Sequence, residues 1–330
     1  MIKRFAAILG NLGNTRDRFC NAYKENLPTT EMLKAAAAIP HVSGIELVGT
    51  WDISPENVKE IRPVLLDHGL QCVSIIPDLF TNPHYAKGSY SSADAKVRQR
   101  AIDYTRRMCD VAFELGCPLL NLWPGQDGYD YLLCADLATE IGWMSECIHE
   151  LASSYPALRF SLEFKPKEPR THSYVARSSD TLLLANQIGL PNVGITIDTG
   201  HSLIGGETIA EAIVLSKRYG DRLFHMHFND NHGTTDDDMI VGSVHTIAFI
   251  EALYWLDRCG YDGWYSMDQY PYREDAAGAI EESILWLMHY SELVDRNRDS
   301  IDTLVRRQDP IATSRHLRQM LAKEPIAVSN

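Results

Sequence analysis

This 330-residue chain lacks several features that would place it in a membrane, on a nucleic acid or in a secreted fold. No apolar run reaches the roughly 18 residues that a membrane-spanning helix needs. Positive charge is scarce, because 31 Lys and Arg residues stand against 44 Asp and Glu residues and the net charge is −13. Such an acidic chain is a poor partner for phosphate backbones. The sequence therefore predicts a soluble protein with no membrane or nucleic-acid partner.

Cysteine is scarce and irregularly spaced. The chain has 7 cysteines, an odd number, and no Cys-x-x-Cys pair. Most of them lie in apolar surroundings, which favours reduced thiols in a core over a disulfide framework. The short apolar stretch near the N-terminus is followed by polar residues and does not resemble a signal peptide. We therefore expect a cytoplasmic protein.

No Gly-x-Gly-x-x-Gly motif follows the first apolar run, and no linker or low-complexity segment divides the chain. Short apolar runs instead alternate with longer helical patterns. Strands that alternate with helices form parallel sheets, and eight such units fit a closed (β/α)8 TIM barrel better than an open doubly wound sheet. The sequence therefore predicts one α/β barrel over residues 1–294. The expected strands cover residues 5–9, 45–48, 72–76, 119–123, 159–164, 193–197, 223–228 and 264–267.

The C-terminal residues 295–330 differ in composition from the predicted barrel. The last helix of the barrel is expected from Asp275 to about Val294, and residues 295–330 are rich in arginine on an otherwise acidic protein. Leu304 and Leu317 could share an apolar side of short helices. We interpret 295–330 as a C-terminal helical tail or arm, which is either a solvated end or a segment that docks on a neighbouring subunit.

The stretch from Leu223 to Asp230 begins as a buried strand and ends in polar residues. Residues two apart in a strand point to the same face, so His225 and His227 share one face. Two imidazoles on an apolar strand near carboxylates indicate a metal site. A pair of hydrogen-bonded core histidines is the alternative, and the motif alone does not decide between them.

Neighbouring strands of the predicted barrel also end in charged residues, and barrel enzymes carry their chemistry at these ends. Glu163, Asp198 and Asp268 each follow or close a strand, as His227 does. Three buried carboxylates would repel one another strongly without a cation. Three carboxylates and one imidazole suit Mn²⁺ or Mg²⁺, with Co²⁺ and Zn²⁺ as alternatives. The sequence therefore predicts a divalent metal at the mouth of the barrel.

Several motifs at these strand ends resemble a known family. They are Glu-x-Lys-x-x-Glu-Pro from Glu163, Asp-Thr-Gly-His from Asp198, His-Phe-Asn-Asp from His227 with an Asp triplet after it, and Asp-Gln at Asp268. Together they resemble L-rhamnose isomerase and, more broadly, the xylose-isomerase-like TIM-barrel sugar isomerases and epimerases. The resemblance covers roughly residues 40–290 and is specific over residues 161–273.

The resemblance implies a site with two metals. Glu163, Asp198, His227 and Asp268 would hold the first ion, which binds substrate. His201, Asp236 and Asp238 would bind a possible second ion, with His227 or a water shared between the two sites. Catalysis would involve Glu163, Lys165, His201 and Asp268.

The resemblance also implies residues that contact the substrate. Lys165 would contact substrate oxygens, and Trp123 would pack on the apolar face of a sugar or else belong to the core. His225 is expected to orient a ligand or the substrate. Arg273 would bind a substrate oxygen or pair with a loop carboxylate.

Two departures leave the reaction open. The chain is short for L-rhamnose isomerase, and Asp268 stands where the ketose 3-epimerases have Glu. We predict a sugar isomerase or epimerase that acts through an enediolate or a hydride shift and forms a homo-oligomer. The alternatives are the catalytic subunit of a C-glycoside deglycosidase or 3-keto-glycoside lyase, which works with a small partner subunit, and a sugar-binding barrel without turnover.

Overall fold

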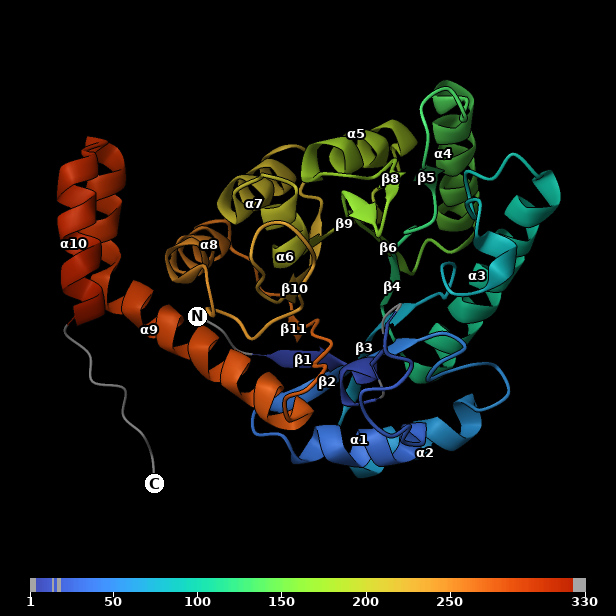
Figure 1. Ribbon diagram of the computed structural model, residues 1–330, viewed down its shortest axis with the longest axis horizontal. Coiled ribbons are helices and arrows are strands. Elements are labelled where there is room, and N and C mark those ends of the chain that lie inside the picture. The colour runs from blue at the N-terminus through green and yellow to red at the C-terminus, as the bar shows by residue number, and fades with distance from the viewer. Residues whose placement is uncertain (1–3, 14, 17–18, 323–330) are drawn as a thin grey trace.

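Eight parallel strands form a closed barrel at the centre of the computed structural model, which describes residues 4–13, 15–16 and 19–322 (Figure 1). The first and last strands close the ring, with Phe5 opposite Tyr265. The strands are β1 (Phe5–Ile8), β2 (Val42–Val48), β3 (Gln71–Ile76), β4 (Leu119–Leu122), β6 (Arg159–Glu163), β9 (Val193–Asp198), β10 (Leu223–Phe228) and β11 (Tyr265–Met267).

Helices surround the barrel, and local signals in the sequence set their ends. The helix Ala95–Leu115, for example, begins after Asp94, whose side chain accepts a hydrogen bond from the backbone N–H of Lys96, and it ends at Gly116 in the left-handed conformation. The helices are α1 (Thr29–Ala38), α2 (Val58–Asp67), α3 (Ala95–Leu115), α4 (Leu137–Ser154), α5 (Ser178–Ile188), α6 (Thr199–Ile204), α7 (Ile209–Arg218), α8 (Thr246–Arg258), α9 (Ala276–Arg307) and α10 (Pro310–Ala322), with short 3-10 turns at Leu9–Leu12 and Pro83–Tyr85.

Polar side chains meet inside the barrel, while the apolar side chains of the same strands pack against the helices. Ser161 and Thr196 lie 2.6 Å apart through their hydroxyls, and Thr196 donates a hydrogen bond to Asn121 at 2.7 Å. Asn121 in turn donates to Glu163 at 2.7 Å. All four side chains are buried. A buried polar chain of this kind holds the strands in register and leads directly to the mouth of the barrel.

A small antiparallel sheet stands beside the barrel mouth and was not predicted. Its strands are β5 (Gly128–Tyr129), β7 (Lys167–Glu168) and β8 (Thr171–Ser173), in the order β5-β8-β7. It ties the segment after β4 to the segment after β6, because Gly128 pairs with Ser173. The chain between Glu163 and α5 therefore folds back over the carboxyl ends of the strands.

The structure confirms the predicted (β/α)8 barrel and its eight strands. The end of the last barrel helix was predicted wrongly: α9 continues past Val294 to Arg307, because no Gly or Pro follows Val294 before Pro310. The proposed boundary at 294/295 thus falls inside a helix, and residues 323–330 of the predicted tail lie outside the described residues. Among the described residues no helix is long and apolar enough to span a bilayer.

The cysteines agree with the prediction of reduced thiols. All seven are free of disulfides, and those at positions 72, 109, 117 and 147 are buried. The remaining three are Cys20, Cys134 and Cys259.

Candidate functional site

A cavity of about 400 Å³ opens at the carboxyl ends of the barrel strands. One side is apolar and comes from the first half of the barrel, and the other is charged and comes from the second half. This division places aromatic rings opposite carboxylates across a space that suits a small molecule. The lining residues are Ile8, Val48, Trp51, Ile76, Phe80, Thr81, Trp123, Gln126, Glu163, Lys165, Glu168, Pro169, His201, Asp236, Asp238, Asp268 and Tyr270.

Four residues predicted as metal ligands converge on the charged side. One ligand atom from each of Glu163, Asp198, His227 and Asp268 lies within 4.8 Å of the others. Nδ1 of His227 is 3.0 Å from Oδ2 of Asp268 and 3.3 Å from Oε1 of Glu163. The residues come from the ends of β6, β9, β10 and β11, so barrel closure brings them together. The structure thus assembles the predicted set, and its role as a metal site stays a prediction.

Burial and mutual repulsion shift the pKa values of the carboxyl groups in this cluster. Burial raises the pKa of Asp198 to about 7, and the carboxylates of Asp236 and Asp268 add to the effect while His201 opposes it. Burial also raises the pKa of Asp268, against the influence of His227. For Glu163 burial acts in the same direction, but His227 and His201 outweigh it and hold its pKa below the ordinary value.

These side chains fit a divalent cation. Three carboxylates and an imidazole provide the oxygen and nitrogen donors that Mn²⁺ or Mg²⁺ takes. Two buried atoms beside the cluster, Nδ1 of His201 and Oδ1 of Asp236, have no hydrogen-bond partner among the described residues. Nδ1 of His201 does lie 3.4 Å from Oε1 of Glu163. Crowded acids and unpaired polar atoms are what a cation or a ligand would satisfy.

The predicted second metal set is only partly assembled. His201 and Asp236 meet, with Nε2 of His201 3.0 Å from Oδ2 of Asp236, but the third member of this group is Asp198 and not Asp238. Asp238 lines the cavity with a left-handed backbone at φ 50, and burial followed by repulsion from Asp236 raises its pKa well above the ordinary value. Asp238 thus lies in the cavity but outside the assembled group, and its part in a second metal site stays a prediction.

Lys165 already supplies one positive charge to Asp236. Its Nζ lies 2.8 Å from Oδ2 of Asp236 and forms a second ion pair with Glu168. Nζ also lies 5.2 Å from the ring centre of Trp123. Burial works against the charge, but Asp236 and Glu168 raise the pKa of Lys165 well above its ordinary value. The ammonium group is thus present in the cavity, as the strand alternation with Glu163 predicts.

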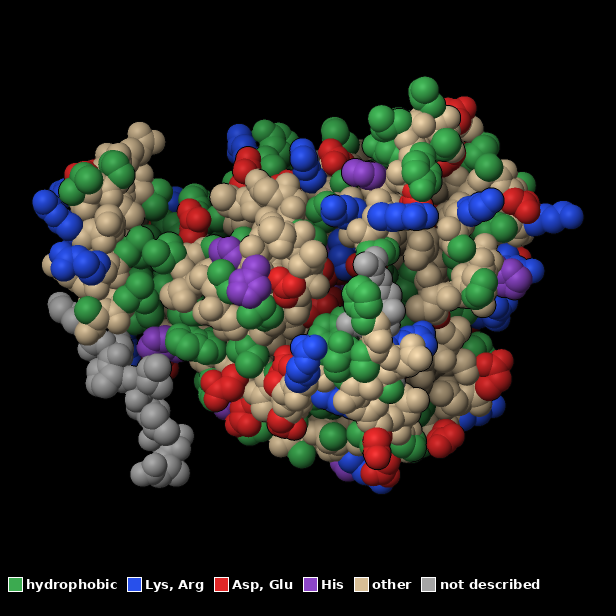
Figure 2. Space-filling model, viewed as in Figure 1, with side chains coloured by type: hydrophobic (Ala, Val, Ile, Leu, Met, Phe, Trp, Pro, Cys, Tyr) green, Lys and Arg blue, Asp and Glu red, His purple; other side chains and the backbone are tan. Residues whose placement is uncertain are grey.

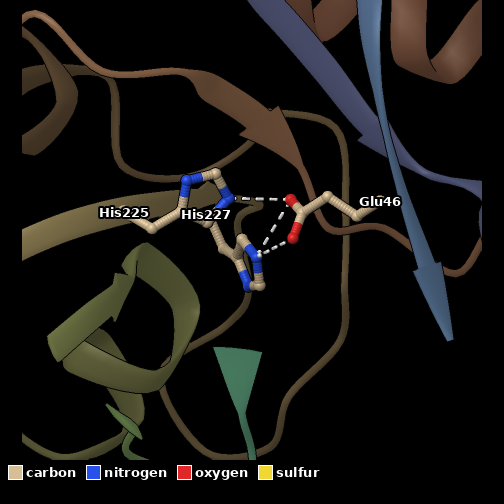
Figure 3. Close-up of side chains that lie close together, drawn as sticks. All are labelled: Glu46, His225 and His227. Carbon is tan, nitrogen blue, oxygen red and sulfur yellow. Dashed lines mark hydrogen bonds and ion pairs between the residues drawn. The ribbon is translucent and has the colours of Figure 1, made fainter. Parts of the chain in front are cut away.

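Glu46 is a central residue that the sequence did not reveal. It is fully buried on β2, and its carboxylate faces both histidines of β10 (Figure 3). Nε2 of His225 lies 2.8 Å from Oε1, and Nε2 of His227 lies 3.2 Å from the same oxygen. Ser74 donates a hydrogen bond to Oε2 at 2.6 Å, and Ser266 donates to Oε1. The only indication of this role in the sequence was a single acidic residue within an otherwise apolar strand.

Glu46 determines the orientation of the His227 imidazole ring. Nε2 of His227 faces Glu46 (Figure 3), so its Nδ1 points the other way, toward Glu163 and Asp268. Burial works to raise the pKa of Glu46, but His225 and His227 hold it well below its ordinary value. A carboxylate behind a metal-binding imidazole fixes the orientation of the ring. His225 belongs to this buried group and does not line the cavity, so it can act on a ligand only through Glu46 and His227, and its expected orienting role stays a prediction.

Aromatic rings form the apolar side of the cavity. The ring of Phe80 lies 4.5 Å from that of Trp123 and 5.8 Å from that of Trp51. Trp123 therefore lines the cavity as predicted for a sugar contact, whereas Trp51 and Phe80 were missed. Arg273 is exposed and stacks over Tyr23 with 5.3 Å to the ring centre. It does not line the cavity, so its predicted contact with substrate is also corrected.

Solved structures with the same fold cover most of the chain. L-ribulose 3-epimerase is similar with a TM-score of 0.72 and 14% identity over 91% of this chain and 98% of that one. A D-tagatose 3-epimerase-like protein has a TM-score of 0.67 and 22% sequence identity, and the match covers 89% of this chain and 99% of that one. A 3-keto-D-glucoside 4-epimerase from E. coli has a TM-score of 0.67 and 18% sequence identity, and the match covers 87% of this chain and 100% of that one.

Sequence comparison leads to the same group of folds. Xylose isomerase from Thermus thermophilus is 26% identical over 292 aligned residues, in a match that covers 83% of this chain and 75% of that protein. The family described as xylose isomerase-like TIM barrel matches residues 33–290. That match contains the strands that supply Glu46, Glu163, Asp198, His227 and Asp268. With most of its length and these five residues inside the match, this chain belongs to the xylose isomerase-like TIM barrel family.

Proposed function

We propose that this protein is a divalent-metal-dependent sugar isomerase or epimerase that acts on a free sugar or keto-sugar. The observation that carries the proposal is the convergence of Glu163, Asp198, His227 and Asp268 in a cavity of about 400 Å³. Mn²⁺ is the proposed ion, with Mg²⁺, Co²⁺ and Zn²⁺ as alternatives. The names of the similar proteins, an isomerase of xylose and epimerases of ketoses and of a keto-glucoside, support a sugar as substrate.

The chemistry needs negative charge to be stabilised beside a carbonyl while a proton leaves carbon. A divalent ion held by the four ligands would supply that stabilisation for sugar oxygens. Glu163 and Asp268 both line the cavity, and their carboxylates lie 3.3 Å and 3.0 Å from Nδ1 of His227. Two carboxylates placed at one side of a cavity can serve as base and acid. We assign proton removal to Glu163 and proton return to Asp268.

Other residues of the cavity would hold the sugar in place. The ammonium of Lys165 can donate hydrogen bonds to a substrate oxygen and stabilise developing negative charge there. His201, held by Asp236 through Nε2, turns Nδ1 toward Glu163 and can move a proton between substrate oxygens. Trp123 provides a flat apolar surface for the C–H face of a sugar ring.

A second function is favoured by the aromatic side of the cavity. Trp51, Phe80 and Trp123 line this side together, and an aromatic aglycone could pack against their rings. The same carboxylates could then remove a proton beside the keto group of a 3-keto-glycoside, and the aglycone would leave by elimination. Such a lyase would work with a small partner subunit, whereas the isomerase would form a homo-oligomer.

One experiment separates these functions. The Mn²⁺-loaded protein is incubated in D₂O with aldoses, ketoses and an aryl 3-keto-glycoside, and NMR follows exchange of carbon-bound protons. Exchange and interconversion of free sugars are the expected result. Release of the aglycone from the 3-keto-glycoside alone would establish the lyase instead, and co-purification of a stoichiometric small protein would agree with it. No exchange with any substrate would contradict both and leave a sugar-binding barrel.

A further inference from the structure

Another cavity, of about 420 Å³, lies between one side of α3 and the segments that follow β2 and β3. We call it the α3 pocket. The segments after β2 and β3 also carry Trp51 and Phe80 of the mouth cavity, but no described residue lines both cavities. Of the described residues that line the α3 pocket, every one except Asp78 has a side chain that can donate a hydrogen bond. The pocket therefore suits a ligand that is rich in acceptor atoms.

Two arginines of α3 bring positive charge to the α3 pocket. Arg100 and Arg107 line it together with Tyr104, and the spacing of these residues places all three on one side of the helix. Figure 2 shows Lys and Arg side chains at the edge of the molecule where Figure 1 places α3. Arg100 and Arg107 are exposed, and neither forms an ion pair with a described residue. Their neighbour Arg106 differs, because it pairs with Glu150 at 2.6 Å and does not line the pocket.

Two phenol groups stand beside these arginines with unused hydrogen atoms. Tyr85 is only 4% exposed, yet its hydroxyl forms no hydrogen bond with any described residue. The hydroxyl of Tyr104 is buried, and its hydrogen has no acceptor in the described part of the chain. Burial raises the pKa of both tyrosines, so both hydroxyls keep their protons at neutral pH. A buried hydroxyl without an acceptor is unfavourable, and a ligand oxygen would offset that cost.

The carboxylate in the wall of the α3 pocket has other partners. Asp78 is 3% exposed, and its Oδ2 accepts hydrogen bonds from the hydroxyls of Thr50, at 2.5 Å, and Thr81. Its Oδ1 accepts a hydrogen bond from the backbone N–H of Thr81 at 2.9 Å. Asp78 thus holds the segment after β2 against the segment after β3. The two guanidinium groups are left without a counterion among the residues that the structure describes.

We propose that the α3 pocket binds a phosphate group, either as free phosphate or as part of a small phosphorylated molecule. A phosphate monoester carries a charge of about −1.5 to −2 near pH 7 and has three terminal oxygens. It can therefore accept hydrogen bonds from Arg100, Arg107 and both tyrosines, whereas a carboxylate has one charge and two oxygens for the same donors. This site uses no residue of the mouth cavity, so the proposal stands apart from the reaction assigned to that cavity.

The test titrates the full chain with glycerol 3-phosphate, inorganic phosphate and glycerate in a calorimeter. Divalent metal is first removed on a chelating resin, so that phosphate has no ion to bind at the barrel mouth, and ionic strength is held constant because salt screens exposed charges. Glycerol 3-phosphate is expected to bind at one site per chain with a Kd of about 1 mM or lower. Glycerate should bind about tenfold more weakly or not at all. Equal affinity for inorganic phosphate would assign the site to free phosphate, and weaker binding of inorganic phosphate would assign it to a phosphorylated molecule.

Variants of α3 locate the binding site. Arg100→Gln and Arg107→Gln should each weaken binding of glycerol 3-phosphate by about tenfold or more, because each removes charge-assisted hydrogen bonds. Tyr104→Phe, which removes only the hydroxyl, should weaken it by about threefold to tenfold. Arg106→Gln is the matched control, since it removes the same charge from the same helix outside the pocket, and it should bind as the native chain does.

Equal melting temperatures would show that these variants fold, as expected for substitutions at exposed positions. Four results would each overturn the proposal. They are no saturable binding up to about 10 mM, glycerate bound as tightly as glycerol 3-phosphate, native affinity in both Arg100→Gln and Arg107→Gln, and an equal loss in Arg106→Gln. The last result would trace the effect to the overall charge of α3 and not to the α3 pocket.

Discussion

His227 has carboxylates on both sides of its ring. We call Glu46, on the Nε2 side, with its hydrogen-bond donors the inner group. We call the cluster on the Nδ1 side, with Glu163, Asp198, Asp236 and Asp268, the outer group. On the inner side, Glu46 accepts hydrogen bonds from two imidazoles and two serine hydroxyls, and its pKa lies well below the ordinary value. On the outer side, Asp198 has the N–H of His201 and the amide of Asn229 as donors, and its pKa is raised to about 7. Both acids are fully buried, so burial alone does not explain the difference.

The difference lies in the ratio of donors to negative charges. Around Glu46 the donors outnumber the single carboxylate, whereas Asp198 shares its surroundings with Glu163, Asp236 and Asp268. A buried acid with sufficient donors is stable as an anion, and one surrounded by other acids needs a proton or a cation. The inner group is therefore suited to hold structure and the outer group to bind metal.

The largest expected effect comes from removing a ligand of the outer group. Asp198→Ala should abolish metal binding and turnover together, with a loss beyond the about 10–100-fold that follows removal of a mere outer-shell partner. Metal analysis and the exchange assay measure both quantities. Asp127→Asn, which changes a buried carboxyl bonded to Ser89 and Ser91, is the control and should retain the metal. Full metal occupancy in both Asp198→Ala and Glu163→Ala would place the site elsewhere.

A smaller loss is expected from the cation of the outer group. Lys165→Met keeps the stem and removes the charge that faces Asp236. Turnover should fall by about 10²–10³-fold, the usual effect of losing one donor to developing negative charge. Metal content should persist, and the exposed Lys167→Met is the matched control. A normal kcat for the metal-loaded Lys165→Met protein would reduce this residue to a partner of the carboxylates.

Changing the inner group should affect the outer one through His227. Glu46→Gln removes the negative charge behind the ring, and its amide cannot accept all the hydrogen bonds that the carboxylate accepts. Metal affinity, measured by competition with a chelator, should fall by about 10–100-fold. Asp127→Asn is again the control, since it removes a buried carboxyl without touching His227. Unchanged metal affinity in Glu46→Gln would confine Glu46 to a role in stability.

The smallest effect concerns an acid that belongs to neither group. Asp52 is buried, accepts a hydrogen bond from the backbone of Val48, and burial raises its pKa to about 7. The folded protein therefore keeps a proton that the unfolded chain has lost, so this contribution to stability declines as pH rises from about 4 to 7. Asp52→Asn should flatten that decline and raise the melting temperature above pH 7. An unchanged pH profile of thermal unfolding would contradict the assigned proton.

The sequence predicts the outer group well because its members follow local rules. The alternation of β6 places Glu163 and Lys165 on one face, and each of the other ligands closes a strand or follows one directly. Glu46 escapes these rules, because its partners lie on β3, β10 and β11 and meet it only when the barrel closes. Asp238 and Arg273 were misplaced since they sit in loops, where long-range contacts set the backbone.

The position of Glu46 also bears on how the chain folds. Its donors come from β3, β10 and β11, so the first quarter of the chain depends on the last for the solvation of one charge. A barrel that lacked β11 would bury this anion without the hydroxyl of Ser266, and removing a partner from a buried charge costs about 1–3 kcal/mol or more. Partly closed barrels are thereby penalised, so the solvation of this one carboxylate couples the first strands of the barrel to the last.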